Sequence, residues 1–157
     1  MKSYVDRRTG KYIHSRLRDA VKSVFICTPY IDEKYIGELA NLSKRNVLVK
    51  LISGNRQTNF TLKEHLKKCE INHQCFQHII ASGKDFIHAK IMIIDNNYAV
   101  DGSANLTKNG LWEQVNYIHV YQGEEVRQIV DVFEKIWTYN ERHLFKYESA
   151  AKPPIAD

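Results

Sequence analysis

The chain has 157 residues, of which 43% are hydrophobic and 26% are charged, as is usual for a globular domain with one hydrophobic core. Its formal net charge of +5 favours a polyanionic partner. No internal repeat and no run of about 18 apolar residues occurs in the sequence, which argues against a repeat architecture and a transmembrane helix.

The ends of the chain and its cysteines suggest a simple organisation. We expect residues 1–147 to form one domain and residues 148–157 to be a C-terminal tail or linker stub. The first residues carry positive charge without the apolar segment of a signal peptide, so we expect a cytoplasmic protein with no membrane anchor. Three cysteines, at 27, 69 and 75, are an odd number and do not suggest a disulfide framework. The spacing of cysteines and histidines over residues 69–78 fits no familiar zinc pattern, so we expect no metal ion and no cofactor.

Segments with helical and with strand periodicity alternate along the chain, which predicts an α/β domain. Amphipathic helices are expected over residues 8–22, 33–44, 61–68 and 124–143. Strands are expected near residues 23–28 and 47–53, from about residue 73, over residues 88–94 and near residues 115–121. One stripe of the last helix is apolar and should pack on the core; it consists of Val126, Ile129, Val130, Phe133, Ile136 and Trp137.

The segment HAKIMIIDNNYAVDGSAN, residues 88–105, carries the strongest functional signal. Residues 88–94 are almost continuously apolar and β-branched, which predicts a buried strand. Side chains alternate between the two faces of a strand, so His88 and Lys90 point the same way. An imidazole and an ammonium so placed would both be satisfied by one phosphate group.

Residues that follow this strand could complete a phosphate site. Asp95 lies at the end of the strand with its side chain on the other face, so we expect it to fix a hairpin turn at residues 96 and 97 through backbone N–H groups. Gly102 frees the backbone, and Ser103 is a good N-cap for a short helix ending near residue 110. The N–H groups at that helix start, the Ser103 hydroxyl and the Asn105 amide would then surround a phosphate.

Each part of this segment also has a purely structural interpretation. A single His-x-Lys on a strand is usually an exposed pair, because both residues favour the surface. Here the neighbouring residues are apolar on both faces, so burying His88 and Lys90 would be costly without a partner. Six specified positions together make the structural interpretation much weaker than it is for any one of them.

This segment resembles the signature of the phospholipase D superfamily, HxKx4Dx6GSxxN. The matching positions are His88, Lys90, Asp95, Gly102, Ser103 and Asn105. The resemblance implies a mixed β-sheet flanked by helices on both faces. It also implies phosphodiester cleavage by two in-line displacements, in which His88 becomes a phosphohistidine and water then attacks the adduct. Lys90, Ser103 and Asn105 would hold the non-bridging oxygens, with no metal required.

Two further features follow from the resemblance. Members of the superfamily usually carry a glutamate that accepts a hydrogen bond from the catalytic imidazole and orients it, and Glu113 is the best candidate here. The alternative for Glu113 is a solvated residue at a helix end. The chemistry needs two histidines and the chain has one motif, so a symmetric homodimer is implied, with His88 of each protomer facing one phosphate. A bell-shaped pH–rate profile centred near the histidine range would follow.

The sequence leaves three functions open. The first is a metal-independent nuclease acting on DNA or RNA. The second is a lipid phosphodiesterase of the phospholipase D or cardiolipin type, which is less favoured because the sequence shows no apolar anchor, and the third is a non-catalytic nucleic-acid-binding or dimerisation domain. Arg56 and Lys84 are weak candidates for nucleic-acid contact, since a solvated face is the usual place for any one basic residue. Basic residues crowd the first part of the chain: Lys2, Arg7, Arg8, Lys11, Arg16, Arg18 and Lys22.

Overall fold

The structure, a computed structural model, describes residues 1–54, 60–81 and 87–150. In these ranges, seven strands form one sheet in the order β1-β7-β6-β5-β2-β3-β4. Strands β2, β3 and β4 run parallel to one another, and the remaining neighbours pair antiparallel. The strands are β1 (Lys2–Asp6), β2 (Ser23–Thr28), β3 (Leu48–Ser53), β4 (Phe76–Ile80), β5 (Ile91–Ile94), β6 (Tyr98–Gly102) and β7 (Asn116–Gln122).

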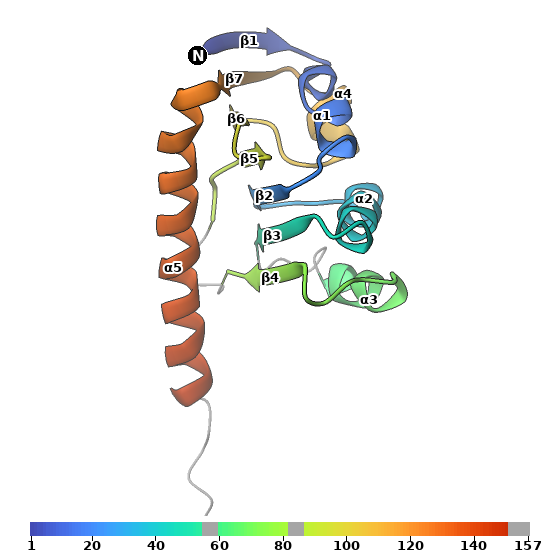
Figure 1. Ribbon diagram of the computed structural model, residues 1–157, viewed down its shortest axis with the longest axis vertical. Helices are drawn as coiled ribbons and strands as arrows, with labels where there is room; N and C mark the ends of the chain where they lie inside the picture. The colour runs from blue at the N-terminus through green and yellow to red at the C-terminus, as the bar shows by residue number, and fades with distance from the viewer. Residues whose placement is uncertain (55–59, 82–86, 151–157) are drawn as a thin grey trace, which may run out of the picture.

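Helices cover both faces of this sheet, so the expected α/β architecture is confirmed. The long helix α5 runs along one face, while α1 to α4 lie on the other (Figure 1). The helical elements are η1 (Thr9–Tyr12), α1 (His14–Arg18), α2 (Glu33–Lys44), α3 (Phe60–Lys68), α4 (Lys108–Trp112), η3 (Gly123–Glu125) and α5 (Val126–Ala150). Within the described ranges, none of these helices has the length and apolar character needed to cross a membrane.

Each face of the sheet has its own hydrophobic core, as the alternation of side chains along the strands dictates. Met92 and Ile94 of β5 face the core formed with α1 and α2. Ile91 and Ile93 of the same strand face the core formed with α5. From α5, one apolar stripe reaches the sheet, and its buried members are Val126, Ile129, Phe133 and Trp137.

Local sequence explains where α2 and the β5–β6 turn begin. Asp32 caps α2 by accepting a hydrogen bond from the Tyr35 N–H at 3.2 Å. Between β5 and β6, Asp95 and Asn96 both have left-handed backbone angles, with φ of 53° and 54°, as a tight hairpin turn of the primed type requires. The turn therefore lies one residue earlier than the sequence predicts.

Three expectations about the elements need correction. The helix predicted over residues 8–22 is instead a 3₁₀ turn, η1, followed by the short α1. The strand predicted from residue 88 enters the ladder only at Ile91, although the Gly102 N–H still donates to the Lys90 carbonyl at 3.3 Å. Strand β1 was not expected at all; among the described strands it lies at the edge of the sheet and pairs with β7 alone.

The topology gathers several chain segments at one end of the sheet. Strand β2 ends where β5 begins, since Cys27 pairs with Ile91. Strand β6 ends where β7 begins, since Gly102 pairs with Ile118. The loop after β2, the segment before β5 and the loop after β6 therefore meet there, and residues on such loops are positioned by the rigid sheet.

Candidate active site

A cavity of about 410 Å³ lies at this end of the sheet. It is lined by Pro29 and Tyr30 after β2, His88 and Lys90 before β5, Ser103 and Asn105 after β6, and Tyr117 of β7. Four residues of the sequence signature therefore share one cavity with three residues that the sequence did not indicate. A volume of this size falls within the range of small-ligand sites, roughly 300–1,000 Å³.

Lys90 is the most buried charged residue of the cavity, with 8% of its surface exposed. Its ammonium donates a hydrogen bond to the His88 carbonyl oxygen at 2.8 Å, which holds it beneath the exposed His88. Burial lowers the pKa of the Lys90 ammonium, and the electrostatic influence of Cys27 opposes this shift. The described residues offer it no ion pair, so an anionic ligand would supply a partner that these residues do not.

Cys27 does not act as that anion. Burial raises the pKa of its thiol to about 12, and the neighbouring Lys90 opposes this increase. The thiol therefore stays protonated at neutral pH. The positive charge of Lys90 is thus available to a bound phosphate.

Ser103 is held in place by the start of β7. Its hydroxyl donates to Asn116 Oδ1 at 2.7 Å and accepts from the Tyr117 N–H at 3.1 Å. Gly102 permits this close approach, because a Cβ at that position would lie 2.3 Å from the Tyr117 carbonyl oxygen. Its φ of +150° would also be unfavourable for any other residue.

Asn105 contributes an unsatisfied polar group to the site. Its Oδ1 is buried and has no hydrogen-bond partner among the described residues. An unpaired buried acceptor costs about 1–3 kcal/mol. The amide can present its N–H₂ group to the same position after a half-turn, since oxygen and nitrogen are nearly indistinguishable in shape. In that second orientation the amide could donate a hydrogen bond to an anionic ligand in the cavity.

Ser103 does not cap a helix, contrary to the prediction. Thr107 is the N-cap of α4, and its hydroxyl accepts from the Gly110 N–H at 2.9 Å. The hydrogen bonds of Ser103 to β7 keep residue 103 outside the helix. The predicted phosphate site at a helix start is therefore absent at Ser103, and the side chains carry the electrostatics instead.

The structure places Asp95 and Glu113 outside the cavity. Asp95 lies at the far end of β5 and accepts hydrogen bonds from the backbone N–H groups of residues 21–23 at 2.7–3.2 Å, rather than from its own turn. Glu113 is exposed at the end of α4, 3.5 Å from the Lys108 ammonium, and does not line the cavity. Arg56 and Lys84 lie outside the described residues.

The sequence did not indicate the cavity residues Pro29, Tyr30 and Tyr117, or Asn116, which accepts the hydrogen bond from Ser103. Pro29 and Tyr30 follow directly after β2, and residues after the carboxyl ends of parallel strands often border sites in α/β sheets, so a signal existed. Asn116 and Tyr117 carried no such signal, because their positions depend on the pairing of β7 with β6. In the described part of the chain, no group of three or more His, Cys, Asp or Glu residues could hold a metal ion.

Comparisons with known proteins find similarity to phospholipase D-like proteins. A sequence profile of the family "Cardiolipin synthase, PLD-like domain" matches residues 13–137, and no curated protein matches significantly. Among solved structures, the phospholipase D family member Nuc from Salmonella typhimurium is 16% identical, with 87% of this chain and 93% of that chain covered and a TM-score of 0.69. NucT from Helicobacter pylori is 17% identical, with 87% and 94% covered and a TM-score of 0.64.

A larger protein shares the same fold. Phosphatidylserine synthase from Haemophilus influenzae is 16% identical, with a TM-score of 0.67. The match covers 83% of this chain but only 35% of that chain. At these identities the structural likeness shows a shared fold.

Proposed function

The chain belongs to the "Cardiolipin synthase, PLD-like domain" family within the phospholipase D superfamily, and on that basis we propose that it is a metal-independent nuclease with a phosphohistidine intermediate. Phosphodiester chemistry is what membership implies. The nucleic-acid substrate, the residue roles and the dimer are our proposal. The observation that carries it is the convergence of His88, Lys90, Ser103 and Asn105 on one cavity.

The proposed reaction has two displacements at phosphorus. In the first, a ring nitrogen of His88 forms a bond to phosphorus while the bond to the leaving oxygen breaks, and a second imidazole protonates that oxygen. In the second, the same imidazole takes a proton from water, the water oxygen bonds to phosphorus, and the bond to His88 breaks. Lys90 and Asn105 hold the non-bridging oxygens, whose negative charge the buried ammonium offsets most strongly in the transition state.

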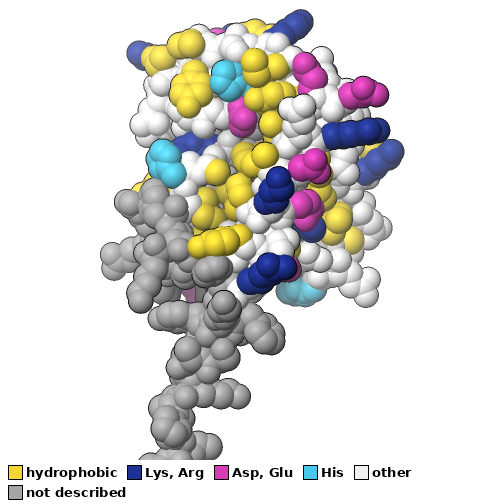
Figure 2. All heavy atoms as spheres, turned by 90° about the vertical axis from the view of Figure 1, so that its left-hand side faces the viewer, with side chains coloured by type: hydrophobic (Ala, Val, Ile, Leu, Met, Phe, Trp, Pro, Cys, Tyr) yellow, Lys and Arg dark blue, Asp and Glu magenta, His cyan; other side chains and the backbone are white. Residues whose placement is uncertain are grey.

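The second imidazole would come from another copy of the chain. Among the described residues that line the cavity, His88 is the sole histidine. Tyr117 lines the cavity with 51% of its surface exposed, and its cross-strand neighbour Val5 is 75% exposed. Hydrophobic side chains lie close to histidines in the upper part of the face shown in Figure 2. An apolar surface beside an incomplete site is what a two-fold interface would bury.

The charge of the chain supports nucleic acid as the substrate, because an excess of basic residues favours a polyanion. A lipid phosphodiester is the second candidate. It is favoured by the description of the matching family and by the fold shared with phosphatidylserine synthase. The chemistry at phosphorus would be the same for both substrates.

Cleavage assays in EDTA separate these functions. Labelled single-stranded DNA, double-stranded DNA, RNA and phosphatidylglycerol vesicles are incubated with the wild type and with His88→Ala. A matched control is His73→Ala, since His73 is an exposed histidine that does not line the cavity. We expect nucleic-acid cleavage that EDTA and His73→Ala leave unchanged and His88→Ala abolishes. Hydrolysis confined to the vesicles would establish the lipid function instead, and nucleic-acid binding without turnover would leave only a binding domain.

Subunit mixing tests the shared site. Wild type and His88→Ala are co-refolded in equal amounts, so that about half of the dimers are mixed. If both imidazoles act on one phosphate, mixed dimers are inactive and total activity falls to about one quarter. A fall to one half would mean that each protomer works alone and would refute the shared site.

A further inference from the structure

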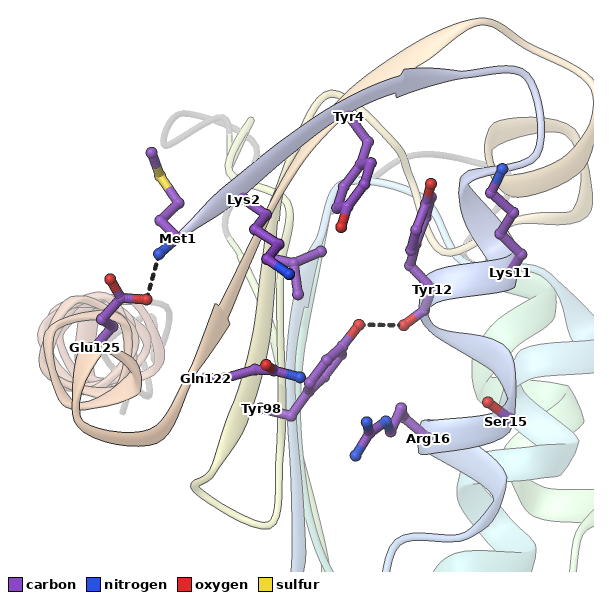
Figure 3. A pocket seen from close by; sticks show the side chains of 11 residues that line it. Met1, Lys2, Tyr4, Lys11, Tyr12, Ser15, Arg16, Tyr98, Gln122 and Glu125 are labelled. Atoms are coloured by element: carbon purple, nitrogen blue, oxygen red, sulfur yellow. Dashed lines mark hydrogen bonds and ion pairs between the residues drawn. The ribbon is translucent and has the colours of Figure 1, made fainter.

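A second pocket, of about 310 Å³ (Figure 3), lies at the opposite end of β6 from the catalytic cavity. Tyr98, which lines it, begins β6, whereas Gly102 at the other end leads into Ser103. Four residue steps of about 3.4 Å separate these positions, or roughly 14 Å. The walls come from β1, from the η1 and α1 turns, and from the ends of the β6–β7 pair. This pocket is therefore a separate site.

Three tyrosine rings form much of the pocket. Tyr4 and Tyr12 stack on each other, with ring centroids 4.2 Å apart and planes 25° apart. Both remain partly exposed. Tyr98 is almost fully buried and its hydroxyl donates to the Tyr12 carbonyl oxygen, which fixes η1 against the sheet. Partly exposed aromatic faces held by such contacts are suited to stacking with a flat ring.

Two cations project into the same pocket without a carboxylate partner. Lys2 and Arg16 are exposed, and neither forms an ion pair with any described residue. The Arg16 guanidinium lies 4.8 Å from the centroid of the Tyr98 ring, while the Lys2 ammonium points toward the pocket centre in Figure 3. Lys11, by contrast, is neutralised by Asp6. Two positive charges are thus available to an anion beside the rings.

The pocket lies in the most basic part of the chain. Residues 1–22 contain seven Lys and Arg residues against two Asp residues, a net charge of +5 that equals the charge of the whole chain. Clustered charge of one sign raises the local concentration of an oppositely charged strand. The combination of aromatic faces with cations is the one that proteins use to hold single-stranded nucleic acid.

We propose that this pocket binds one nucleotide of a single strand, with the base stacked on the Tyr4–Tyr12 pair and a phosphate held by Lys2 and Arg16. The inference rests on the proposed function for the class of substrate, but it concerns binding and not cleavage. The volume of the pocket is near the lower limit of roughly 300 Å³ for ligand pockets, so the pocket suits one nucleotide rather than a duplex. A strand engaged here would be anchored at the end of β6 that lies away from Ser103.

Binding is measured by fluorescence anisotropy of a labelled oligothymidylate in EDTA, with His88→Ala as the background so that cleavage plays no part. In this background Lys2→Ala and Arg16→Ala are combined. The control combines Lys67→Ala with Lys135→Ala, which removes the same charge from exposed positions on α3 and α5. We expect the pocket pair to weaken binding about tenfold more than the control pair. It should also reduce the slope of log affinity against log salt by about 0.7, the value for one phosphate contact on a single strand.

The role of the rings has its own tests. An abasic strand of equal length should bind at least about fivefold more weakly than oligothymidylate, since one stacked base contributes at least that factor. Ultraviolet irradiation with a 5-bromodeoxyuridine strand should crosslink Tyr4 or Tyr12, identified by mass spectrometry. The proposal would be overturned if the two variant pairs had equal effects or if the abasic strand bound as tightly as oligothymidylate. Crosslinks found only at other residues would also overturn it, as would a pocket that binds free thymidine monophosphate but no strand.

These outcomes are distinguishable from failure of the proposed function. If wild type cleaves no nucleic acid yet the pocket pair weakens strand binding as expected, the nuclease proposal fails and the pocket stands. If wild type cleaves nucleic acid and the pocket pair binds like the control, the pocket proposal fails alone.

Discussion

Replacement of Lys90 by methionine should strongly reduce turnover in a protein that still folds. Lys90 is buried, and among the described residues its ammonium donates one hydrogen bond, to the His88 carbonyl oxygen. Burial lowers the pKa of this ammonium, so its charged form is less favourable in the folded protein than in water. The protein therefore carries a cost in stability for keeping this charge in the site.

The magnitude follows from two opposing changes. Methionine keeps a long unbranched side chain, but it loses a charged hydrogen bond worth about 1.5–3 kcal/mol. Replacement of buried charge by an apolar group gains roughly 1–4 kcal/mol. We expect the free energy of unfolding to change by between about −2 and +2.5 kcal/mol. Turnover should fall about 10²- to 10³-fold, as it does when one preorganised donor to a transition state is removed.

The pH dependence of stability gives this prediction a sign. Because the folded-state pKa of Lys90 is lowered, the unfolded chain binds more protons than the folded chain between the two pKa values, and wild-type stability rises with pH in that window. The methionine variant lacks this rise. Any excess in the free energy of unfolding of the variant over that of the wild type should therefore be greatest near neutral pH. It should shrink as the pH approaches the ordinary lysine pKa of about 10.4.

Urea unfolding at neutral and at alkaline pH measures the stability, and oligonucleotide cleavage in EDTA measures turnover. Lys135→Met, at an exposed position of α5, is the matched control and should change neither. A Lys90→Met protein that is destabilised by more than about 3 kcal/mol, or that keeps wild-type turnover, would refute the reasoning.

Three further substitutions test other parts of the site. Gly102→Ala should lower the free energy of unfolding by at least about 2 kcal/mol, because its Cβ would meet the Tyr117 carbonyl oxygen at 2.3 Å with φ at +150°. The control Gly37→Ala, whose Cβ meets no atom within 4 Å in the middle of α2, should instead raise it by roughly 0.5–1 kcal/mol. Equal effects of the two variants in thermal or urea unfolding would contradict this. Asp95→Ala should cost about 1–3 kcal/mol, because three backbone N–H groups lose their acceptor, and turnover per folded molecule should not change. Glu113→Gln should leave turnover intact, because Glu113 pairs with Lys108 outside the cavity; a large loss would restore its predicted role.

Elements with strong local signals could be predicted from the sequence with accuracy. The bounds of β2 and α2 are those expected, since a continuous apolar run defines the first and the Asp32 cap starts the second. The apolar stripe of α5 was also expected from its spacing. The α/β architecture and the superfamily follow from such local patterns, and both are confirmed.

Features that depend on contacts distant in sequence could not be predicted. Strand β1 exists because β7 pairs with it from more than a hundred residues away, and its five residues carry no signal of their own. Ser103 and Thr107 are both good N-cap residues, and the choice of Thr107 reflects the hydrogen bonds of Ser103 to β7. For the site, the signature indicated the residues within one segment, whereas Tyr30 and Tyr117 come from the packing of other strands around it.

The most direct test is to trap the covalent intermediate. Wild-type protein is mixed with ³²P-labelled single-stranded DNA or RNA in EDTA and quenched with alkali within the first turnover, because a phosphorus–nitrogen bond to histidine survives alkali and is lost in acid. We expect a labelled, alkali-stable and acid-labile adduct that mass spectrometry assigns to His88 and that His88→Ala lacks. Cleavage that persists in His88→Ala, or an adduct on another residue, would contradict it.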